Sequence, residues 1–117
     1  MHAGYWVYIL ASQKLGTLYI GVTSDILGRI EAHKAGTGSE FTRKYGVKLL
    51  VHYEWFNVIE FAIQREKSLK RYRRDWKINL IERENPHWQD LYPALEKRHG
   101  GHVPDSWPDG SSAQGRG

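Results

Sequence analysis

The chain of 117 residues contains no cysteine. Disulfide bonds and zinc sites built from thiolates are therefore excluded, and the fold must be held together by apolar packing. The sequence also lacks an apolar run near the roughly 20 residues that a membrane-spanning helix needs. Its N-terminus has neither the basic segment nor the apolar stretch of a secretory signal peptide. We therefore expect a cytoplasmic protein that does not enter a membrane.

Aromatic residues are abundant, with five Trp and seven Tyr in a chain that is 40% hydrophobic. This content is enough to build the core of a single domain. Apolar residues become scarce near position 98, and the segment beyond is rich in Gly, Pro, Ser and Asp. We predict one folded domain over residues 3–98 and a disordered tail over residues 99–117.

Apolar periodicity and turn residues predict a small number of strands and helices. The expected elements are, in chain order, strands at 5–11 and 17–23, a helix from Ser24 or Asp25 to about Ala35, a loop with one helical turn at 38–46, a central strand at 48–56, a long helix from near Val58 with a bend near Arg73 and an end at Asn85-Pro86, and a short helical segment at 86–95. This order is typical of an α+β domain with a small three-stranded sheet, mixed or antiparallel, flanked by helices.

Two tyrosines stand in the first two predicted strands. If Ala11 pairs with Gly16 across the loop, Tyr8 lies directly opposite Tyr19, and both hydroxyl groups point to one side of the sheet. Gly21 would then leave space beside Tyr19 for a backbone or a ligand. The simpler interpretation is an ordinary pair of packed aromatic rings. The alternative is that both hydroxyl groups belong to a site.

Glu66 falls inside the apolar stripe of the long predicted helix, four residues after Ala62, three after Ile63 and three before Leu69. A carboxylate in such a position costs free energy unless a cation meets it. An ion pair with one of the many Arg or Lys side chains is one interpretation. The other is a ligand for a divalent cation, with magnesium favoured because it prefers carboxylate, water and phosphate oxygens.

Arg29 and His33 are four residues apart and therefore share one face of the first predicted helix. A guanidinium group suits phosphate oxygens, and an imidazole beside it could position a proton or a phosphate. The plainer interpretation is that both are surface side chains, since Ile26, Leu27 and Ile30 supply the buried side of this helix.

Positive charge is concentrated between positions 64 and 83. Eight Lys or Arg stand there against three acidic residues, in a chain whose formal net charge is +4. Such a surface attracts a polyanion, and nucleic acid is the commonest one in the cytoplasm. A solvated helix face explains the charges equally well. The predicted nucleic-acid contacts are Arg65, Lys67, Lys70, Arg71, Arg73, Arg74 and Lys77.

These positions together resemble the GIY-YIG nuclease family, in particular its small stand-alone bacterial members, over about residues 5–92. The motif residues occur in the order of the family, namely Trp6-Val7-Tyr8, Tyr19-Ile20-Gly21, Arg29, His33 and Glu66. Tyr8 and Tyr19 are eleven positions apart, and Arg29 follows ten positions later. The first motif departs from the family in that Trp6 and Val7 stand where it has glycine and isoleucine.

The resemblance implies hydrolysis of a DNA phosphodiester bond with the help of one Mg²⁺ or Mn²⁺ ion. Glu66 would hold the ion, Arg29 would stabilise the transition state, and Tyr8 would activate the attacking water. Tyr19 and His33 would assist. A free phenol has a pKa near 10. Tyr8 can therefore serve as a base only if nearby positive charge favours its phenolate or if its proton moves within the transition state.

Gly21 and Asn85 are further candidates, which would support the site. The hypothesis that follows is a metal-dependent endonuclease that nicks DNA, with a role in DNA repair or recombination. A nucleic-acid-binding module that kept the fold and lost turnover is the main alternative. A scaffold whose aromatic surface binds protein is a third. The sequence leaves the oligomeric state open, with a monomer as the simplest case.

Overall fold

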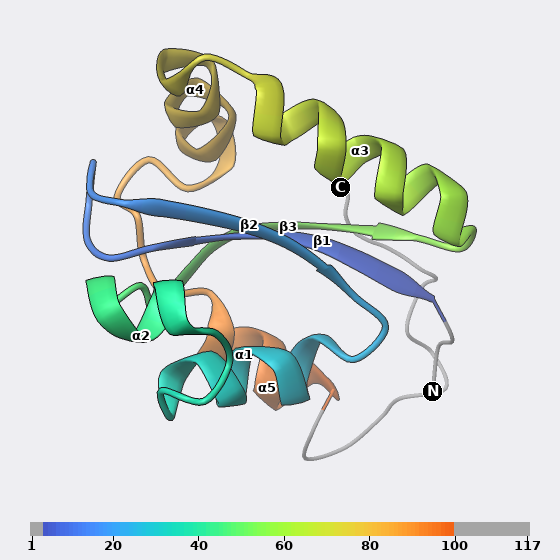
Figure 1. Ribbon diagram of the computed structural model, residues 1–117, viewed down its shortest axis with the longest axis horizontal. Coiled ribbons are helices and arrows are strands. Elements are labelled where there is room, and N and C mark those ends of the chain that lie inside the picture. The colour runs from blue at the N-terminus through green and yellow to red at the C-terminus, as the bar shows by residue number, and fades with distance from the viewer. Residues whose placement is uncertain (1–3, 100–117) are drawn as a thin grey trace.

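The computed structural model describes residues 4–99 and contains a three-stranded antiparallel sheet with helices on both faces (Figure 1). The predicted α+β class is therefore confirmed. The predicted tail lies outside the described residues from position 100 onward. The elements are β1 (Tyr5–Ala11), β2 (Leu18–Thr23), α1 (Ile26–Lys34), α2 (Glu40–Tyr45), β3 (Leu49–Phe56), α3 (Ile59–Arg71), α4 (Arg74–Glu84) and α5 (Tyr92–His99).

The central strand of the sheet is β1, with β2 and β3 on its two sides. The prediction that the strand at 48–56 is central was therefore wrong. Both strands are rich in apolar residues, but β1 is buried along nearly its whole length, whereas the second half of β3 is only partly covered. Val7 and Ile9 pack toward α3 and α4, and Tyr8 and Leu10 pack toward α1 and α5. The alternation of side chains along β1 thus divides the core into two clusters.

The pairing of β1 with β2 differs from the predicted register by two residues. Tyr8 lies opposite Gly21, and Tyr19 lies opposite Leu10. The connecting loop spans residues 12–17 and is longer than expected. Because side chains alternate with a period of two, the shift keeps Tyr8 and Tyr19 on one face but makes them diagonal neighbours.

Local capping sets the ends of the first two helices, and the cap of α1 is Asp25, one of the two residues that the sequence offered. The Asp25 side chain caps α1 by accepting a hydrogen bond from the backbone N–H of Gly28. Ser39 caps α2 in the same way through the backbone N–H of Thr42. Gly46 ends α2 in the left-handed conformation, with φ 63°, which glycine adopts without a steric penalty.

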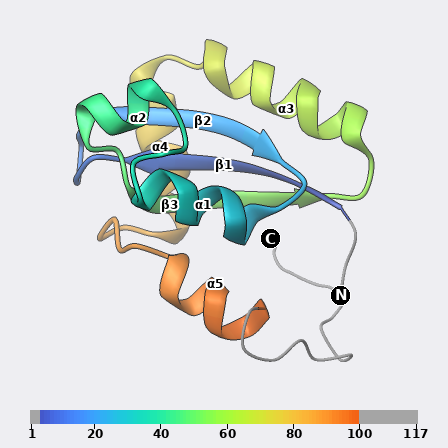
Figure 2. The ribbon, with the colours of Figure 1, turned by 60° about the horizontal axis from the view of Figure 1, so that its bottom comes forward.

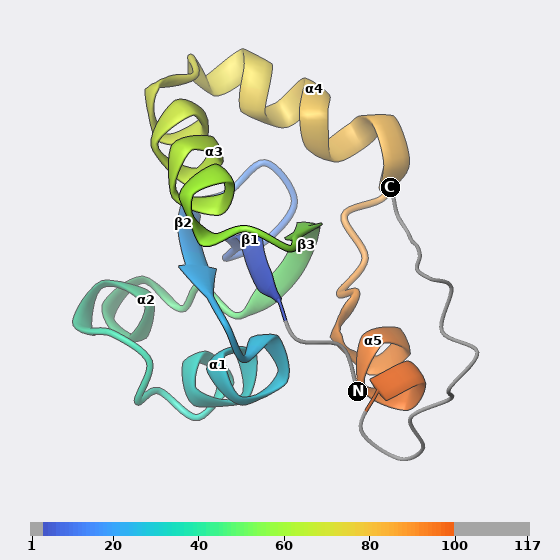
Figure 3. The ribbon, with the colours of Figure 1, turned by 90° about the vertical axis from the view of Figure 1, so that its right-hand side faces the viewer.

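The long helical region after β3 is broken where the sequence predicted a bend. α3 ends at Arg71, Tyr72 is extended, and α4 begins at Arg74. α4 then ends directly before Asn85-Pro86. The break lets the two helices cross the same face of the sheet in different directions (Figure 3).

The helices form two layers around the sheet. α3 and α4 cover one face, and α1, α2 and α5 cover the other (Figures 1 and 2). This arrangement places α1 and α2 on the face that carries Tyr8. None of the helices within residues 4–99 has the length and apolar content that crossing a bilayer requires.

Candidate active site

A chain of buried hydrogen bonds links β1 to α1 and α2. The hydroxyl oxygen of Tyr8 lies 3.0 Å from Nε2 of His33, and Nδ1 of His33 lies 3.0 Å from Oγ1 of Thr42. All three side chains are almost completely buried. Burying polar side chains in an apolar core costs free energy unless they are hydrogen-bonded to one another, and here each of the three side chains has a hydrogen-bond partner.

The contacts of the Thr42 hydroxyl group favour one tautomer of His33. Oγ1 of Thr42 lies 3.2 Å from the carbonyl oxygen of Ser39, to which it donates, and 2.9 Å from the Ser39 hydroxyl oxygen. We infer that Thr42, with its single proton used in this way, accepts from Nδ1–H of His33 and that Nε2 accepts from the Tyr8 hydroxyl. Burial and the charge of Arg29 lower the pKa of His33, so the ring is neutral near pH 7.

Gly21 makes room for the phenol of Tyr8 on the neighbouring strand. A Cβ atom at position 21 would lie 2.4 Å from the hydroxyl oxygen of Tyr8 and 2.5 Å from its Cζ. Gly38 does the same for His33, since a Cβ atom there would lie 2.3 Å from Nδ1. The space that Gly21 was expected to leave for a ligand is therefore filled by the Tyr8 ring.

The substitution Gly21→Ala should lower the free energy of unfolding by about 1–3 kcal/mol, which is the usual cost of an overpacked core. The added methyl group meets a buried ring that cannot swing into solvent. Urea denaturation of both proteins measures the difference. In a Tyr8→Leu background the smaller side chain leaves room, so Gly21→Ala should cost much less. An unchanged cost there would show that the strain does not involve Tyr8.

Tyr19 and Arg29 border the buried hydrogen bonds. The ring centroid of Tyr19 lies 6.3 Å from that of Tyr8 and 5.3 Å from that of His33. Arg29 is exposed on α1, one turn before His33, and its guanidinium group forms no hydrogen bond or ion pair within residues 4–99. Its charge nevertheless acts on both Tyr8 and His33. The guanidinium group is therefore close to the phenol and available to an anion.

Glu66 lies on α3, which covers the opposite face of the sheet from α1 (Figure 1), and its charge also acts on Tyr8. Oε2 of Glu66 lies 2.7 Å from Nζ of Lys70, so the ion-pair interpretation describes the contact that is present. The Lys70 side chain is 54% exposed, against 15% for Glu66. Ion pairs one helical turn apart contribute about 0.3–0.5 kcal/mol when both partners are exposed, and here only Lys70 is. Lys70 can move into solvent, but the Glu66 carboxylate then needs another cation in its place.

The environment of Tyr8 disfavours the phenolate. Burial raises the pKa of the phenol far above its ordinary value of 10.0, Tyr19 and Glu66 raise it further, and Arg29 offsets a part of this. The charge of Arg29 alone is therefore too weak to ionise it. The second route, proton movement during a reaction, is the one for which the structure supplies a partner, because Nε2 of His33 lies 3.0 Å from the phenol oxygen.

Acidic side chains around this site are few. Within the part of the chain that the structure describes, no group of three or more His, Asp and Glu side chains is placed to bind a metal ion together. This donor set does not fit a closed zinc site. A single carboxylate such as Glu66 fits magnesium or manganese, which take water and phosphate oxygens as their other ligands.

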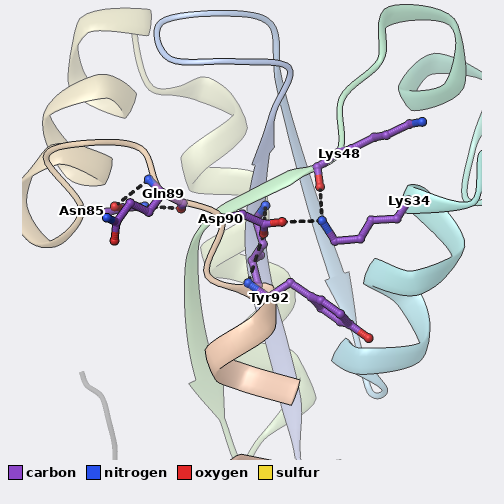
Figure 4. A network of polar contacts seen from close by, with 7 residues as sticks. Lys34, Lys48, Asn85, Gln89, Asp90 and Tyr92 are labelled. Carbon is purple, nitrogen blue, oxygen red and sulfur yellow. Dashed lines mark hydrogen bonds and ion pairs between the residues drawn. The ribbon is translucent and has the colours of Figure 1, made fainter. Parts of the chain in front are cut away.

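The side chain of Asn85, which follows α4, forms hydrogen bonds to backbone groups of other segments. Its side-chain nitrogen donates to the carbonyl oxygen of Val51 at 3.2 Å. The same nitrogen donates to the carbonyl oxygen of Gln89 at 2.9 Å, and the side-chain oxygen accepts from the Gln89 backbone N–H at 3.0 Å (Figure 4). These bonds join α4 to β3 and to the segment before α5. They do not include the hydroxyl of Tyr8, so support of the site by Asn85 stays a prediction.

Several cations of the basic region have partners within the fold. Arg65 donates to both carboxylate oxygens of Glu54, at 2.8 and 3.0 Å. Burial opposes the ionisation of Glu54, but hydrogen bonds from His52 and Arg65 outweigh it and lower its pKa to about 2. Arg74 donates to two backbone carbonyl groups of the β1–β2 loop. Among the predicted nucleic-acid contacts, those whose side chains have no hydrogen bond or ion pair to a described residue are Lys67, Arg71 and Lys77.

Sequence reasoning did not find Ser39 and Thr42. Their spacing of three residues is typical of a helix cap, and that signal was available in the sequence. The second role of Thr42, its hydrogen bond to His33, joins α2 to α1. Such a contact between two helices has no local sequence pattern and depends on how the helices pack.

Several known proteins are similar to this chain. The sequence profile of the GIY-YIG catalytic domain matches residues 4–79. A UPF0213 protein of Haloquadratum walsbyi is 37% identical over 82 residues, which cover 70% of this chain and 91% of that protein. A UPF0213 protein of Staphylococcus haemolyticus is 35% identical over 80 residues, which cover 68% of this chain and 96% of that protein. The solution structure of a UPF0213 protein from Bacillus halodurans is 32% identical, with a TM-score of 0.49, and the match covers 75% of this chain and 93% of that one.

Proposed function

This chain belongs to the GIY-YIG family, whose catalytic domain is that of endonucleases, and we propose that it is a metal-dependent endonuclease that nicks DNA. The observation that carries the proposal is the buried hydrogen-bond chain of Tyr8, His33 and Thr42, in which the charges of Arg29 and Glu66 act on Tyr8. The names of the relatives state no activity, so the assignment depends on this site. The proposal extends to a cytoplasmic location and to a role in DNA repair or recombination.

We assign the general base to Tyr8 and His33 acting together. A water molecule that attacks the phosphorus gives a proton to the hydroxyl oxygen of Tyr8, while the phenol proton passes to Nε2 of His33. No free phenolate is needed, which suits a phenol whose burial raises its pKa. The bond between phosphorus and the leaving oxygen then breaks, the leaving oxygen takes up a proton from solvent water, and one strand is cut. Thr42 holds His33 in the form that accepts the proton.

The remaining side chains would bind the phosphate and the ion. Arg29 would meet the non-bridging oxygens, where negative charge grows during attack. Tyr19 would orient the reacting groups from beside the rings of Tyr8 and His33. Glu66 would hold one Mg²⁺ or Mn²⁺ ion once Lys70 leaves its carboxylate, and the ion would neutralise the scissile phosphate. The flanking DNA phosphates would contact Lys67, Arg71 and Lys77.

The test of this function is the conversion of supercoiled plasmid to nicked circles by the full chain. We expect conversion in the presence of Mg²⁺ or Mn²⁺ and none in EDTA, because the site has too few cationic groups to neutralise the phosphate without the ion. A protein that binds the plasmid and leaves it supercoiled at every metal concentration would be a nucleic-acid-binding module without turnover. The Glu66–Lys70 ion pair is the observation that favours this second function.

The substitution Thr42→Val should slow nicking by about 10-fold, since general base catalysis contributes about 10²–10⁴ in rate and Thr42 acts on the base only through His33. Valine keeps the shape and removes the acceptor for Nδ1–H. Nitrogen chemical shifts of His33 should show a neutral ring protonated on Nδ1 in the wild-type chain and a mixture of the two neutral tautomers in the variant. Thr42→Ser keeps the hydroxyl group and should restore both results. A wild-type ring protonated at Nε2 would contradict the assignment.

The acid limb of the pH–rate profile of nicking should have its midpoint below pH 6.5. Burial and Arg29 lower the pKa of His33 from its ordinary value of 6.5. The mechanism needs the neutral ring, so activity is lost only as the pH falls through this lowered value. Single-turnover rates across the acid range measure the midpoint. A midpoint above pH 6.5 would contradict the buried, neutral His33.

A further inference from the structure

Two aromatic side chains of α2 lie in solvent beside the proposed site. Phe41 is 43% exposed and Tyr45 is 49% exposed. Their spacing of four residues places them on one side of the helix, and their ring centroids lie 4.9 Å apart. Folding gains free energy when such rings are buried, so a neighbouring exposed pair suggests an interaction site.

The exposed pair continues a line of rings that begins at the buried site. The ring centroid of Phe41 lies 6.0 Å from that of Tyr19, and the centroid of Tyr19 lies 6.3 Å from that of Tyr8. The line therefore leads from the proposed base to the surface of α2. A group that binds to Phe41 and Tyr45 would lie next to a phosphate held at the site.

The position of α2 relative to the site is well defined. Ser39 caps its start, and Gly46 ends it in the left-handed conformation. On its buried side, Thr42 bonds to His33. The helix that holds the proton acceptor in place thus also holds the exposed rings, so a ligand on these rings would have a set distance from the reacting groups.

Cations flank the exposed rings. Arg43 and Lys44 are exposed on the same helix, and Nζ of Lys44 lies 5.4 Å from the ring centroid of Tyr45. The one acid of α2, Glu40, lies 4.0 Å from Arg43 and is exposed. Rings next to cations are typical of surfaces that bind single-stranded nucleic acid, where bases stack on the rings and phosphates meet the cations.

We propose that Phe41 and Tyr45 form a stacking surface for unpaired bases of the DNA strand, next to the phosphodiester bond that is cut. A duplex does not present the faces of its bases, since each is stacked on its neighbours and must be unstacked before a protein ring can cover it. The favoured substrates are therefore DNA with unpaired nucleotides at the cut, such as a single strand, a splayed end or a branch. The position of the cut depends on the proposed function, whereas the stacking needs no turnover.

Fluorescence anisotropy of labelled strands in EDTA tests the stacking without cleavage. The probes are an oligothymidine and an abasic strand of equal length, which keeps the phosphates and lacks the bases. We expect the wild-type chain to bind the oligothymidine about 10-fold more tightly, because the abasic strand cannot stack. The double variant Phe41→Leu with Tyr45→Leu should lose this preference and keep its affinity for the abasic strand. Phe61→Leu, at an exposed ring of α3, is the control and should keep the preference.

Equal affinity of the wild-type chain for both strands would overturn the proposal, and so would a preference that survives in the double variant. Circular dichroism of the variants checks that they are folded. The two proposals fail separately. A chain that prefers the oligothymidine but never nicks plasmid would support the stacking surface and contradict the proposed endonuclease. A chain that nicks plasmid but binds both strands equally would support the endonuclease and contradict the stacking surface.

Discussion

Replacing Glu66 with glutamine should lower the rate of plasmid nicking by about 10³-fold, a loss typical of removing one preorganised charge from an active site. Glutamine keeps the size of the side chain and removes the negative charge that would hold the divalent ion. The Glu66–Lys70 ion pair is also lost, but the exposed Lys70 can move into solvent and glutamine carries no charge that needs a partner, so the variant should fold. Initial rates at saturating Mg²⁺ measure the effect.

Glu60→Gln is the matched control for this result, because Glu60 is an exposed acid in the first turn of the same helix. It should nick DNA at the wild-type rate. The Glu66→Gln chain should still bind DNA at least as tightly as the wild type, since the substitution removes a negative charge. If Glu66→Gln nicks at the wild-type rate, Glu66 does not hold the ion, and its ion pair with Lys70 is its main role.

Replacing Arg29 with alanine should lower the maximal rate by about 10²–10³-fold, because the guanidinium group supplies positive charge where the phosphate becomes more negative. The Arg29 side chain is exposed and makes no hydrogen bond or ion pair to the described residues, so the fold should not change. Arg29→Lys keeps the charge but loses the planar fork and should give an intermediate rate. Burial and Arg29 lower the pKa of His33. Loss of Arg29 should therefore also move the acid limb of the rate profile to higher pH.

Arg71→Ala separates catalysis from DNA binding, since Arg71 is exposed on α3 within the basic region. This control should weaken DNA binding and reduce its dependence on salt, while the rate at saturating DNA stays at the wild-type level. For Arg29→Ala we expect the opposite pattern, in which the rate at saturating DNA falls and DNA binding stays near the wild-type level. If Arg29→Ala weakens binding and leaves the saturated rate unchanged, Arg29 is a DNA contact and not a catalytic residue.

Signals between near neighbours in the chain were sufficient to predict most helices and strands. Asp25 caps α1, and Asn85-Pro86 ends α4, where the sequence placed these boundaries. The order of the motif residues predicted the family, and the GIY-YIG profile match confirmed it. Capping, helix breaking and apolar periodicity each depend on residues only a few positions apart, which is why a single sequence records them.

Packing between distant segments set the strand order, the hairpin register and the partners of the polar side chains. Tyr8 and His33 are 25 positions apart, and Arg65 meets Glu54 across 11 positions from a different element. The protonation of Tyr8 also depends on packing between distant segments. Arg29 and its charge were visible in the sequence, but the burial that raises the pKa of Tyr8 arises only when the helices close over β1. Desolvation and competition between partners depend on the whole fold, and no local pattern encodes them.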